Sequence, residues 1–542
     1  MAAQRASAGC KATYDEANNP FHASGYMNRQ VTTRQSPTVV NAIFYNRAFW
    51  DGRANNIFNG VDPFGWRSNI ASTKVGVLVD MIGVPYLEKI AMPDAALASQ
   101  AVGPPLSSVE MACQGQTFAD LGRRLLNLRP LAGQSVHALD SVFGKTPALL
   151  PAAPAKGLNT TYADLIRKAF DTKYWVSPSK YKLDDFGQVL VDRTAGYSQM
   201  EHNFSFFWGL AIMAYEATLV SDKSPFDTAT MPLQAQKGRD LFTGKAGCTL
   251  CHGGPVFSAA ANPNMTLAPK DPLNVGKPDP APFVSLELIT TPDNVPGIYD
   301  AGFYNIGVRS TGEDLGLGGV DPYGTTLSYA RQFFMELQRL RVPDEFKPPF
   351  CIPEPVAPIN PLLPPEKPKV CTPVAIGSKA VVDGAFKTPS LRNVGLTPPY
   401  MHNGSFASLE QVVAFYNRGG DRRTAGCGDT TGFGTSCTNV HPAMQPLNLT
   451  AVEQADLVAF LKSLTDDRVA CHAEMFDHPE LKLIKGHATT TGVANPPKRA
   501  TDIVVTLPAV GRGGLKQLGL PCFPNSGNLF GDLQTTFSKI AK

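Results

Sequence analysis

The segment Leu241–Phe257 reads LFTGKAGCTLCHGGPVF and holds the most specific motif of the sequence. Within it, Cys248-Thr-Leu-Cys251-His252 has the pattern C-x-x-C-H. Two thiols at this spacing can bond the two vinyl groups of one haem, and the following histidine is placed to ligate the iron. The segment therefore predicts a covalently attached c-type haem. The alternative, two structural cysteines beside an incidental histidine, is weaker because such a pentapeptide is rare by chance.

The bulk composition is typical of a folded soluble protein. The chain has 542 residues, too many for one ordinary core, so two domains with extensions are expected. The formal net charge is +3 with no Lys/Arg-rich run, which predicts neither a nucleic-acid nor an anionic-membrane partner. The most apolar helix-like stretch, Phe204–Val220, is short for a membrane span and contains Glu216. We expect a buried core helix there.

The pattern along the chain predicts three regions. Residues 1–225 form a first region, residues 226–475 a second one with the C-x-x-C-H motif, and residues 476–542 a C-terminal extension. Strand signals are sparse, so the predicted fold class is mainly α with long loops. Helical patterns in the second region cover 232–244, 409–418 and 449–464.

Eight of the ten cysteines lie outside the haem motif. An even number suits disulfides in an oxidising compartment. The local pairs Cys351–Cys371 and Cys427–Cys437 are attractive because each brackets a Gly- or Pro-rich loop. Each bridge would contribute ~2–4 kcal/mol by restricting the unfolded chain. Free buried thiols remain the alternative.

Several further segments resemble the bacterial dihaem cytochrome c peroxidase and MauG-type family. The resemblance covers roughly residues 30–115 and 235–470. It implies two cytochrome c-like helical domains that carry haem c. The segments, besides the haem motif and the helix at 449–464, are RQSPTVVNAIFYNRAFWDGRA (34–54), SQAVGPPLSSVEM (99–111), AGFYNIGV (301–308) and FKTPSLRNVGLTPPYMHNGSFASLEQVVAFYNRGG (386–420).

The resemblance implies a sixth ligand for the iron that His252 holds. Family spacing places it at Tyr416, 14 residues after His402, where ordinary peroxidases of the family carry Met and MauG-type enzymes carry Tyr. A phenolate is a hard, anionic ligand, so it would stabilise the ferric or higher states of the iron and lower its potential. Otherwise Tyr416 is a packed helix aromatic and Met401 or His402 is the ligand.

The resemblance also implies a catalytic pocket in the first region. Gln100, Pro104 and Glu110 fall where the family has its peroxide pocket. Glu110 would carry a proton between the two peroxide oxygens, help worth ~10²–10⁴-fold in rate, and Gln100 would orient peroxide. Trp50 matches the family's tryptophan between the two haems and would pass electrons. Without the family, Glu110 is a helix-start acid and Trp50 a core residue.

A calcium site is implied in the same way. Asn41, Thr397 and Pro399 match the family's interdomain calcium ligands. Ca²⁺ takes side-chain and backbone carbonyl oxygens, which suits Asn and the carbonyl of Pro. The ion would tie the two haem domains together.

The chain departs from the family in its first haem motif. Cys10 has no second Cys three residues away, and Cys471-His472 is preceded by Arg468 where the motif needs a Cys. Met1–Gly9 has no apolar export segment. We expect a sequence that lacks its N-terminal segment, which would supply both the export signal and a second haem. The alternative is a one-haem descendant with a vestigial peroxide pocket.

The resemblance therefore implies a periplasmic haem oxidoreductase that reduces hydrogen peroxide. Electrons would come from a small cytochrome c or a cupredoxin, and a homodimer is also implied. MauG-like oxidation of a protein or organic substrate is the neighbouring alternative, which Tyr416 favours. A monohaem electron-transfer protein is another, and the long loops between motifs also suit rubber-cleaving dihaem oxygenases.

Overall fold

The computed structural model describes most of the chain, apart from its two ends and several internal segments. The predicted pairs Cys351–Cys371 and Cys427–Cys437 lie outside the described residues. The proline-rich stretch between Cys351 and Cys371 lies outside them as well. The described residues are 22–23, 26–27, 32–108, 110–112, 115–152, 155–261, 286–291, 294–337, 378–422, 439–487, 498–499, 501–525 and 527.

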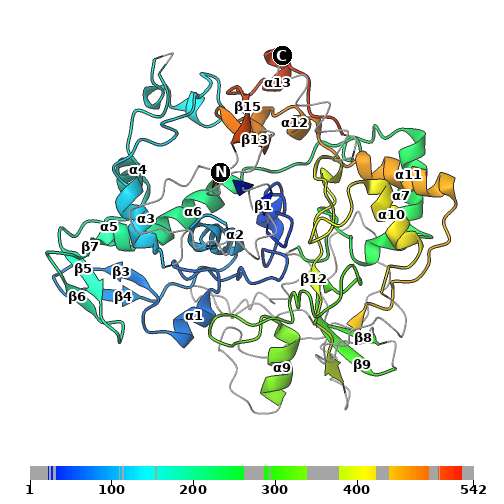
Figure 1. The fold of residues 1–542 in the computed structure, drawn as a ribbon, viewed down its shortest axis with the longest axis horizontal. Helices are drawn as coiled ribbons and strands as arrows, with labels where there is room; N and C mark the ends of the chain where they lie inside the picture. Colours follow the sequence, from blue (N-terminus) through cyan, green and yellow to red (C-terminus); the bar gives the residue numbers. More distant parts are fainter. Residues whose placement is uncertain are drawn as a thin grey trace, which may run out of the picture.

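Helices and short strands alternate along the chain (Figure 1). The α-helices are α1 (Trp66–Ala71), α2 (Ala96–Ala101), α3 (Phe118–Leu125), α4 (Tyr162–Ala169), α5 (Gln199–His202), α6 (Phe204–Glu216), α7 (Leu233–Thr243), α9 (Tyr329–Leu337), α10 (Leu409–Asn417), α11 (Ala451–Lys462), α12 (Asp467–Ala470) and α13 (Gly514–Gln517). The strands are β1 (His22–Ala23), β2 (Tyr26–Met27), β3 (Val77–Val79), β4 (Tyr86–Glu88), β5 (Lys180–Leu183), β6 (Val189–Val191), β7 (Tyr197–Ser198), β8 (Leu286–Thr290), β9 (Pro296–Asp300), β10 (Phe303–Tyr304), β11 (Lys379–Ala380), β12 (Phe386–Lys387), β13 (Leu481–His487), β14 (Lys498–Arg499) and β15 (Asp502–Leu507).

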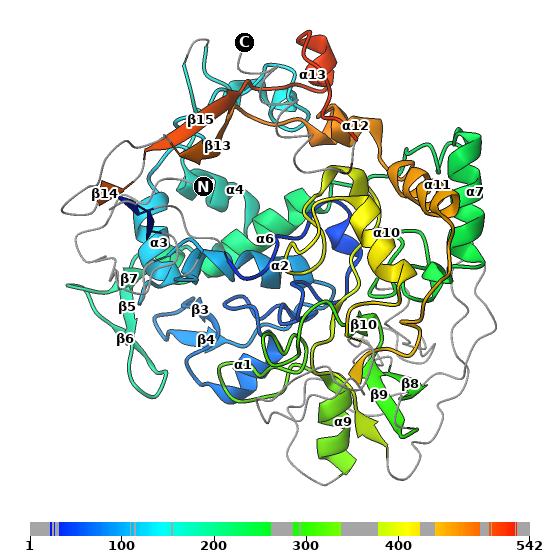
Figure 2. The same cartoon turned by 45° about the vertical axis from the view of Figure 1, so that its right-hand side comes forward.

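Helices α7, α10 and α11 form the core that carries the haem motif (Figure 2). All three were predicted from their apolar spacing, and each begins and ends within a few residues of the prediction. Thr450 caps α11 in a capping box with Glu453, which satisfies backbone N–H groups at the helix start. Gly238 lets α7 cross α11 closely, because a Cβ there would lie 1.9 Å from the carbonyl oxygen of Asp456.

A second helical core lies in the first part of the chain. Helix α6 is the predicted apolar helix, and it packs on α2, α3 and α5. Phe204, Phe206 and Phe207 of this helix are all buried in one cluster with Phe58. The apolar run is therefore a core helix. Within the described residues, no helix has the length and apolar character that a membrane span needs.

Small sheets are more numerous than the sequence led us to expect. The described strands form six sheets of two or three strands each, so helices are only part of the fold. The β8–β9–β11 sheet packs with α9 around a buried cluster that includes Ile298, Phe303 and Tyr329. These strands are two to five residues long and come from hairpins and from pairing across loops. Alternation over so few residues leaves little signal in the sequence.

A buried ion pair joins residue 47 of the first predicted region (1–225) to residue 300 of the second (226–475). The guanidinium of Arg47 donates to the carboxylate of Asp300 at 2.8 Å, and both side chains are fully buried. Its cation lies 4.3 Å and 4.1 Å from the ring centroids of Phe303 and Tyr329. Residues near Trp50 are thereby held against β9 and β10, the strands beside the haem motif.

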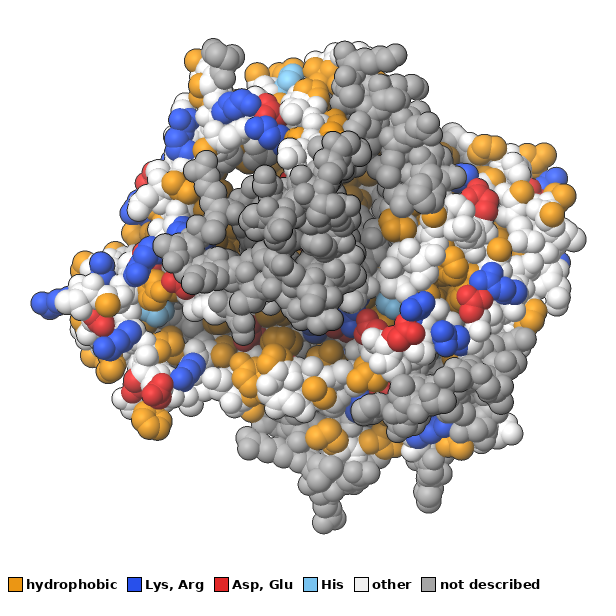
Figure 3. Space-filling model, viewed as in Figure 1, with side chains coloured by type: hydrophobic (Ala, Val, Ile, Leu, Met, Phe, Trp, Pro, Cys, Tyr) orange, Lys and Arg blue, Asp and Glu red, His pale blue; other side chains and the backbone are white. Residues whose placement is uncertain are grey.

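The C-terminal residues fold back on the first part of the chain. Strands β13 and β15 pair antiparallel, and Glu480 just before β13 accepts hydrogen bonds from Ser135 and Lys156. A disulfide joins Cys471 to Cys522. This bridge fits the expectation of disulfides outside the haem motif, although the pair itself was not predicted. On the face in Figure 3, acidic and basic side chains are interspersed, in line with the small net charge.

Candidate haem site

The C-x-x-C-H segment lies directly after α7. The chain turns through Gly247, whose φ of +60° is in the left-handed region, and enters a 3-10 turn at Cys248–Leu250. Cys248 and Cys251 both face the same cavity as free thiols. Burial raises the pKa of both thiols well above the ordinary value. Two free thiols at the wall of one cavity are what thioether attachment to a haem requires.

The ring of His252 is oriented by backbone hydrogen bonds to Phe257 and Pro389. Its Nδ1–H donates to the backbone carbonyl of Phe257 at 3.0 Å. A hydrogen bond of this kind sets the tautomer and ring orientation of a ligating histidine, with Nε2 carrying the lone pair. Burial lowers the pKa of His252 to about 4, so the ring is neutral near pH 7. A neutral imidazole is the form that binds iron.

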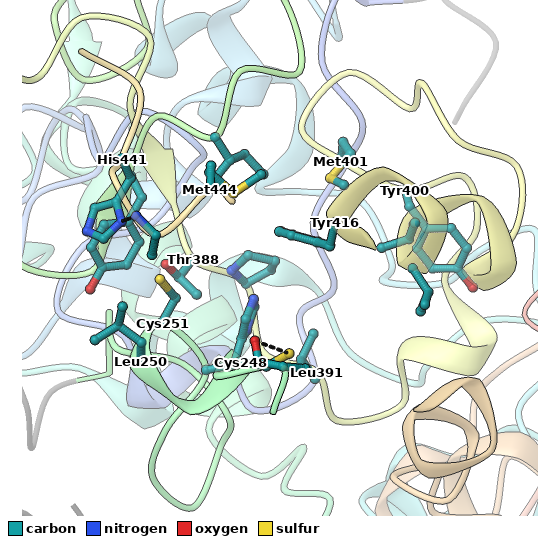
Figure 4. A pocket seen from close by; sticks show the side chains of 18 of the residues that line it. Cys248, Leu250, Cys251, Thr388, Leu391, Tyr400, Met401, Tyr416, His441 and Met444 are labelled. Atoms are coloured by element: carbon teal, nitrogen blue, oxygen red, sulfur yellow. Dashed lines mark hydrogen bonds between the residues drawn. The ribbon is translucent and has the colours of Figure 1, made fainter. Parts of the chain in front are cut away.

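The cavity beside these three residues is large and mostly apolar; we call it the large cavity. It encloses about 1450 Å³, part of it open to solvent. Tyr416 projects into it from α10, and Met401 and Met444 lie to either side of that ring in Figure 4. Burial raises the pKa of the Tyr416 phenol above its ordinary value. The predicted sixth ligand therefore reaches the same cavity as His252.

The rival ligands also reach this cavity. Met401 lines it with a backbone φ of +69°, an uncommon conformation for a residue with a side chain. His402 is buried, and its ring stacks on Phe386 with centroids 3.6 Å apart. Its pKa is lowered to about 4 by burial. A ring held face to face against Phe386 is less free to turn toward an iron than the Tyr416 side chain.

A second cavity adjoins the first; we call it the small cavity. It has a volume of about 720 Å³, part of it open to solvent. It is lined by residues of segment 34–54 and of segment 387–401, together with Gln100. Gln100, from the end of α2, and Trp50 both line it. Trp50 lines the large cavity as well, so its indole forms part of the wall between the two. Its predicted place between two haems stays a prediction.

Trp50 is held by hydrogen bonds on both sides. Its indole N–H donates to the carbonyl of Gln35 at 2.7 Å, and its own carbonyl accepts from the backbone N–H of Lys387 at 2.7 Å. The ring centroid lies 6.4 Å from that of His402 in an edge-on arrangement. Asp51 and Arg53 beside it form a local ion pair at 3.0 Å.

Glu110 is not among the residues that line either cavity. It lies on an exposed turn after Pro104–Leu106, with its backbone N–H donating to the carbonyl of Ser107. Pro104 begins the 3-10 turn that follows Gln100. The structure thus brings Gln100 and Trp50 together and places Glu110 apart from them.

The three expected calcium ligands are distributed unevenly. The side-chain amide of Asn41 is occupied by the backbone of Ser221, to which it donates at 3.1 Å and from which it accepts at 2.8 Å. Thr397 and Pro399 line the small cavity, whereas Asn41 does not. Among the described residues, no group of three or more His, Cys, Asp or Glu side chains is placed to hold a metal ion. The calcium site stays a prediction.

The residues present fit a c-type haem. The two thiols, His252 and Tyr416 border one apolar cavity, which suits a planar apolar macrocycle. Sequence reasoning missed His441, Met444 and Lys387, which line the same cavity. Lys387 lies in a motif segment that carried the resemblance, but only the structure shows that its side chain is buried. His441 and Met444 have no motif around them in the sequence.

Comparison with known proteins supports the resemblance. Residues 8–234 match the model of the di-haem cytochrome c peroxidase family. Cytochrome-c peroxidase IdrP1 of Denitromonas iodatirespirans is 30% identical over 279 residues, which is 50% of this chain and 52% of that protein. The methylamine utilization protein MauG of Methylorubrum extorquens is 25% identical over 266 residues, 48% of this chain and 44% of that protein.

Solved structures add a likeness at lower identity. The diheme peroxidase BthA from Burkholderia thailandensis is 15% identical, with 82% of this chain and 92% of that chain covered and a TM-score of 0.33. The chain spans about half the length of the curated relatives that it matches. The resemblance to di-haem cytochrome c peroxidases and MauG is confirmed by the family match and by these relatives.

Proposed function

We propose that this relative of the di-haem cytochrome c peroxidases is a c-type haem oxidoreductase that reduces hydrogen peroxide with electrons from a small redox protein. One observation carries the proposal: Cys248, Cys251, His252 and Tyr416 all line a single apolar cavity. We place the peroxidase reaction before the alternatives because two of the curated relatives are named cytochrome-c peroxidase.

The roles of the residues follow from their chemistry. Bound haem would supply reversible one-electron chemistry at its iron. His252 would hold that iron, with the Phe257 carbonyl keeping the imidazole neutral and oriented, and Tyr416 would favour the oxidised iron. Trp50, in the wall shared by both cavities, would carry electrons toward the small cavity.

The small cavity is the proposed place of peroxide chemistry. Gln100 would orient peroxide by hydrogen bonds. Glu110 would have to swing from its exposed turn, or act through water, to move a proton between the peroxide oxygens. General-acid geometry often tightens only when substrate is bound, so Glu110 is kept in the proposal.

The remaining features of the proposal come from the family resemblance. They are a second haem c, a calcium ion held by Asn41, Thr397 and Pro399, a periplasmic location, a small cytochrome c or cupredoxin donor, and a homodimer. The division into residues 1–225, 226–475 and 476–542 is part of the same proposal.

The decisive experiment combines a haem count with a turnover assay. Intact mass of the protein from its native cells gives the number of covalent haems, and stopped-flow mixing with hydrogen peroxide and a reduced cytochrome c gives the rate. We expect two haems and peroxide-dependent oxidation of the donor. A single haem with no peroxide-dependent turnover would leave only an electron-transfer protein, the weaker alternative.

A second candidate function is MauG-like oxidation of a protein or organic substrate. Tyr416 in the large cavity favours it, because the family resemblance assigns a tyrosine ligand to MauG-type enzymes. The test is peroxide consumption without a reduced donor, coupled to oxidation of an added substrate. Peroxide turnover that strictly requires a reduced cytochrome c would exclude this reaction.

A further inference from the structure

Lys387 is a buried cation whose charge no acidic side chain of the described residues neutralises. Its side chain lies in the walls of both cavities, and the residue is 5% exposed. The Nζ atom lies 3.3 Å from the ring centroid of Tyr45, an arrangement that gives a cation–π attraction. In the described part of the chain, its ammonium forms neither an ion pair nor a hydrogen bond with a carboxylate.

The backbone places this ammonium where it is. Strand β12 pairs with β10, with Lys387 opposite Phe303, and the N–H of Lys387 donates to the carbonyl of Trp50. Tyr45 is fixed in turn, because its phenol oxygen accepts from the backbone N–H of Ser390. The lysine is therefore held at the shared wall by contacts from both parts of the chain.

The walls of the two cavities are otherwise uncharged. Neither contains an Arg, Asp or Glu among its described residues, and Lys387 is the one lysine in both sets. Burial lowers the pKa of the histidines at residues 252, 402 and 441 to about 4, so they are neutral near pH 7. Lys387 is the one residue there that can carry a full positive charge.

An isolated buried ammonium is unfavourable. Taking the ammonium out of water costs more free energy than a cation–π contact returns. Burial accordingly lowers the pKa of Lys387 to about 7. An anion at the wall would restore the charged form, so the site is suited to an occupant that carries a carboxylate.

We propose that Lys387 binds a carboxylate at the wall between the two cavities, namely a propionate of the haem attached at Cys248 and Cys251. The inference rests on the proposed function for the haem itself. A haem has two propionates and an otherwise apolar ring, and the lining of the large cavity has one cation to meet them. A small carboxylic acid from solution is the other source with the same chemistry.

The test is a redox titration of the haem-loaded protein with Lys387→Met and Lys387→Gln. A positive charge near the iron favours its ferrous state, so both variants should shift the ferric–ferrous equilibrium toward ferric. We expect about a tenfold shift, or ~59 mV for a one-electron couple. Lys387→Arg should keep the wild-type potential. The propionate bands in the resonance Raman spectrum should move with the neutral variants, which a merely structural role would not cause.

A matched control uses Lys245→Met, because Lys245 is close to the motif but exposed and paired with Glu453 at 2.9 Å. Its potential should stay at the wild-type value. In one outcome, the neutral Lys387 variants attach haem and keep the wild-type potential and propionate bands. That outcome would overturn the propionate inference and leave the proposed function standing. Failure of the wild type to attach haem would instead overturn the proposed function. A wild-type potential that responds to added acetate, with no response in Lys387→Met, would overturn the propionate assignment in favour of a dissolved carboxylate.

Discussion

The large and the small cavity share a wall but are assembled in different ways. The large cavity takes its two thiols and His252 from one pentapeptide, and of the four expected haem-binding residues only Tyr416 is distant in sequence. The small cavity takes Trp50, Gln100 and Thr397 from three segments, and its described lining contains neither Cys nor His. A few adjacent residues can therefore specify a covalent cofactor site, whereas a substrate pocket depends on how distant segments meet.

The largest effect should come from removing the attachment site of the large cavity. Cys248→Ala combined with Cys251→Ala should abolish covalent haem, because no thioether can form. Intact mass under denaturing conditions measures the loss. A double variant that keeps a covalent haem would show that attachment lies elsewhere in the chain.

A cysteine control separates this loss from general damage. Cys471→Ala with Cys522→Ala should leave haem attached but lower the free energy of unfolding by ~4 kcal/mol, from the loop-entropy relation. That bridge closes a separation of 51 residues. Urea unfolding of the haem-loaded variant measures the change.

The next effect tests whether the small cavity works in catalysis. Glu110→Gln should slow the peroxide step by ~10²–10⁴-fold, since the amide can neither accept nor deliver the proton. Stopped-flow kinetics with hydrogen peroxide measures it. Glu313→Gln is the control, because Glu313 forms an exposed pair with Arg309. Equal peroxide rates for the two variants would show that Glu110 takes no part in the mechanism. The small cavity would then have to act without this carboxylic acid.

A smaller effect distinguishes the ligands of the large cavity. Tyr416→Met should raise the haem potential by on the order of 100 mV, within the ~0.8 V range that axial ligands cover, because a neutral thioether replaces an anionic phenolate. Tyr400→Phe is the matched control, since Tyr400 lines the same cavity but donates its hydroxyl to the carbonyl of Val394. A potential that stays constant in Tyr416→Met would transfer the ligand role to Met401 or His402.

The smallest effect concerns the pH dependence of stability and His402, which lines the large cavity. Burial lowers the pKa of His402 from 6.5 to about 4, so the unfolded chain binds more protons between these values. The contribution of neutral His402 to the free energy of unfolding is therefore fully present above about pH 6.5. It is lost as the pH falls toward 4, by up to about 3 kcal/mol. Urea unfolding against pH should show a shallower loss in His402→Gln than in the wild type. Identical slopes would mean that His402 stays protonated or exposed in the native state.

Much of the second region could be predicted from the sequence because its signals are local. Apolar spacing predicted α7, α10 and α11, and capping residues such as Thr450 mark their starts. The C-x-x-C-H pattern indicated the haem site without any tertiary information. The short strands were missed, because pairs such as β10 with β12 join segments about 80 residues apart and leave no periodic signal.

The sequence by itself determined the chemistry of attachment, since thiols and imidazole at one spacing can react with haem wherever the chain places them. Only the tertiary structure decided what surrounds that chemistry. It put Trp50 in both cavity walls, left Glu110 on an exposed turn and buried Lys387 without an acidic partner among the described residues. The physical reason is that burial and charge compensation are properties of neighbours in space, and those neighbours come from segments hundreds of residues apart.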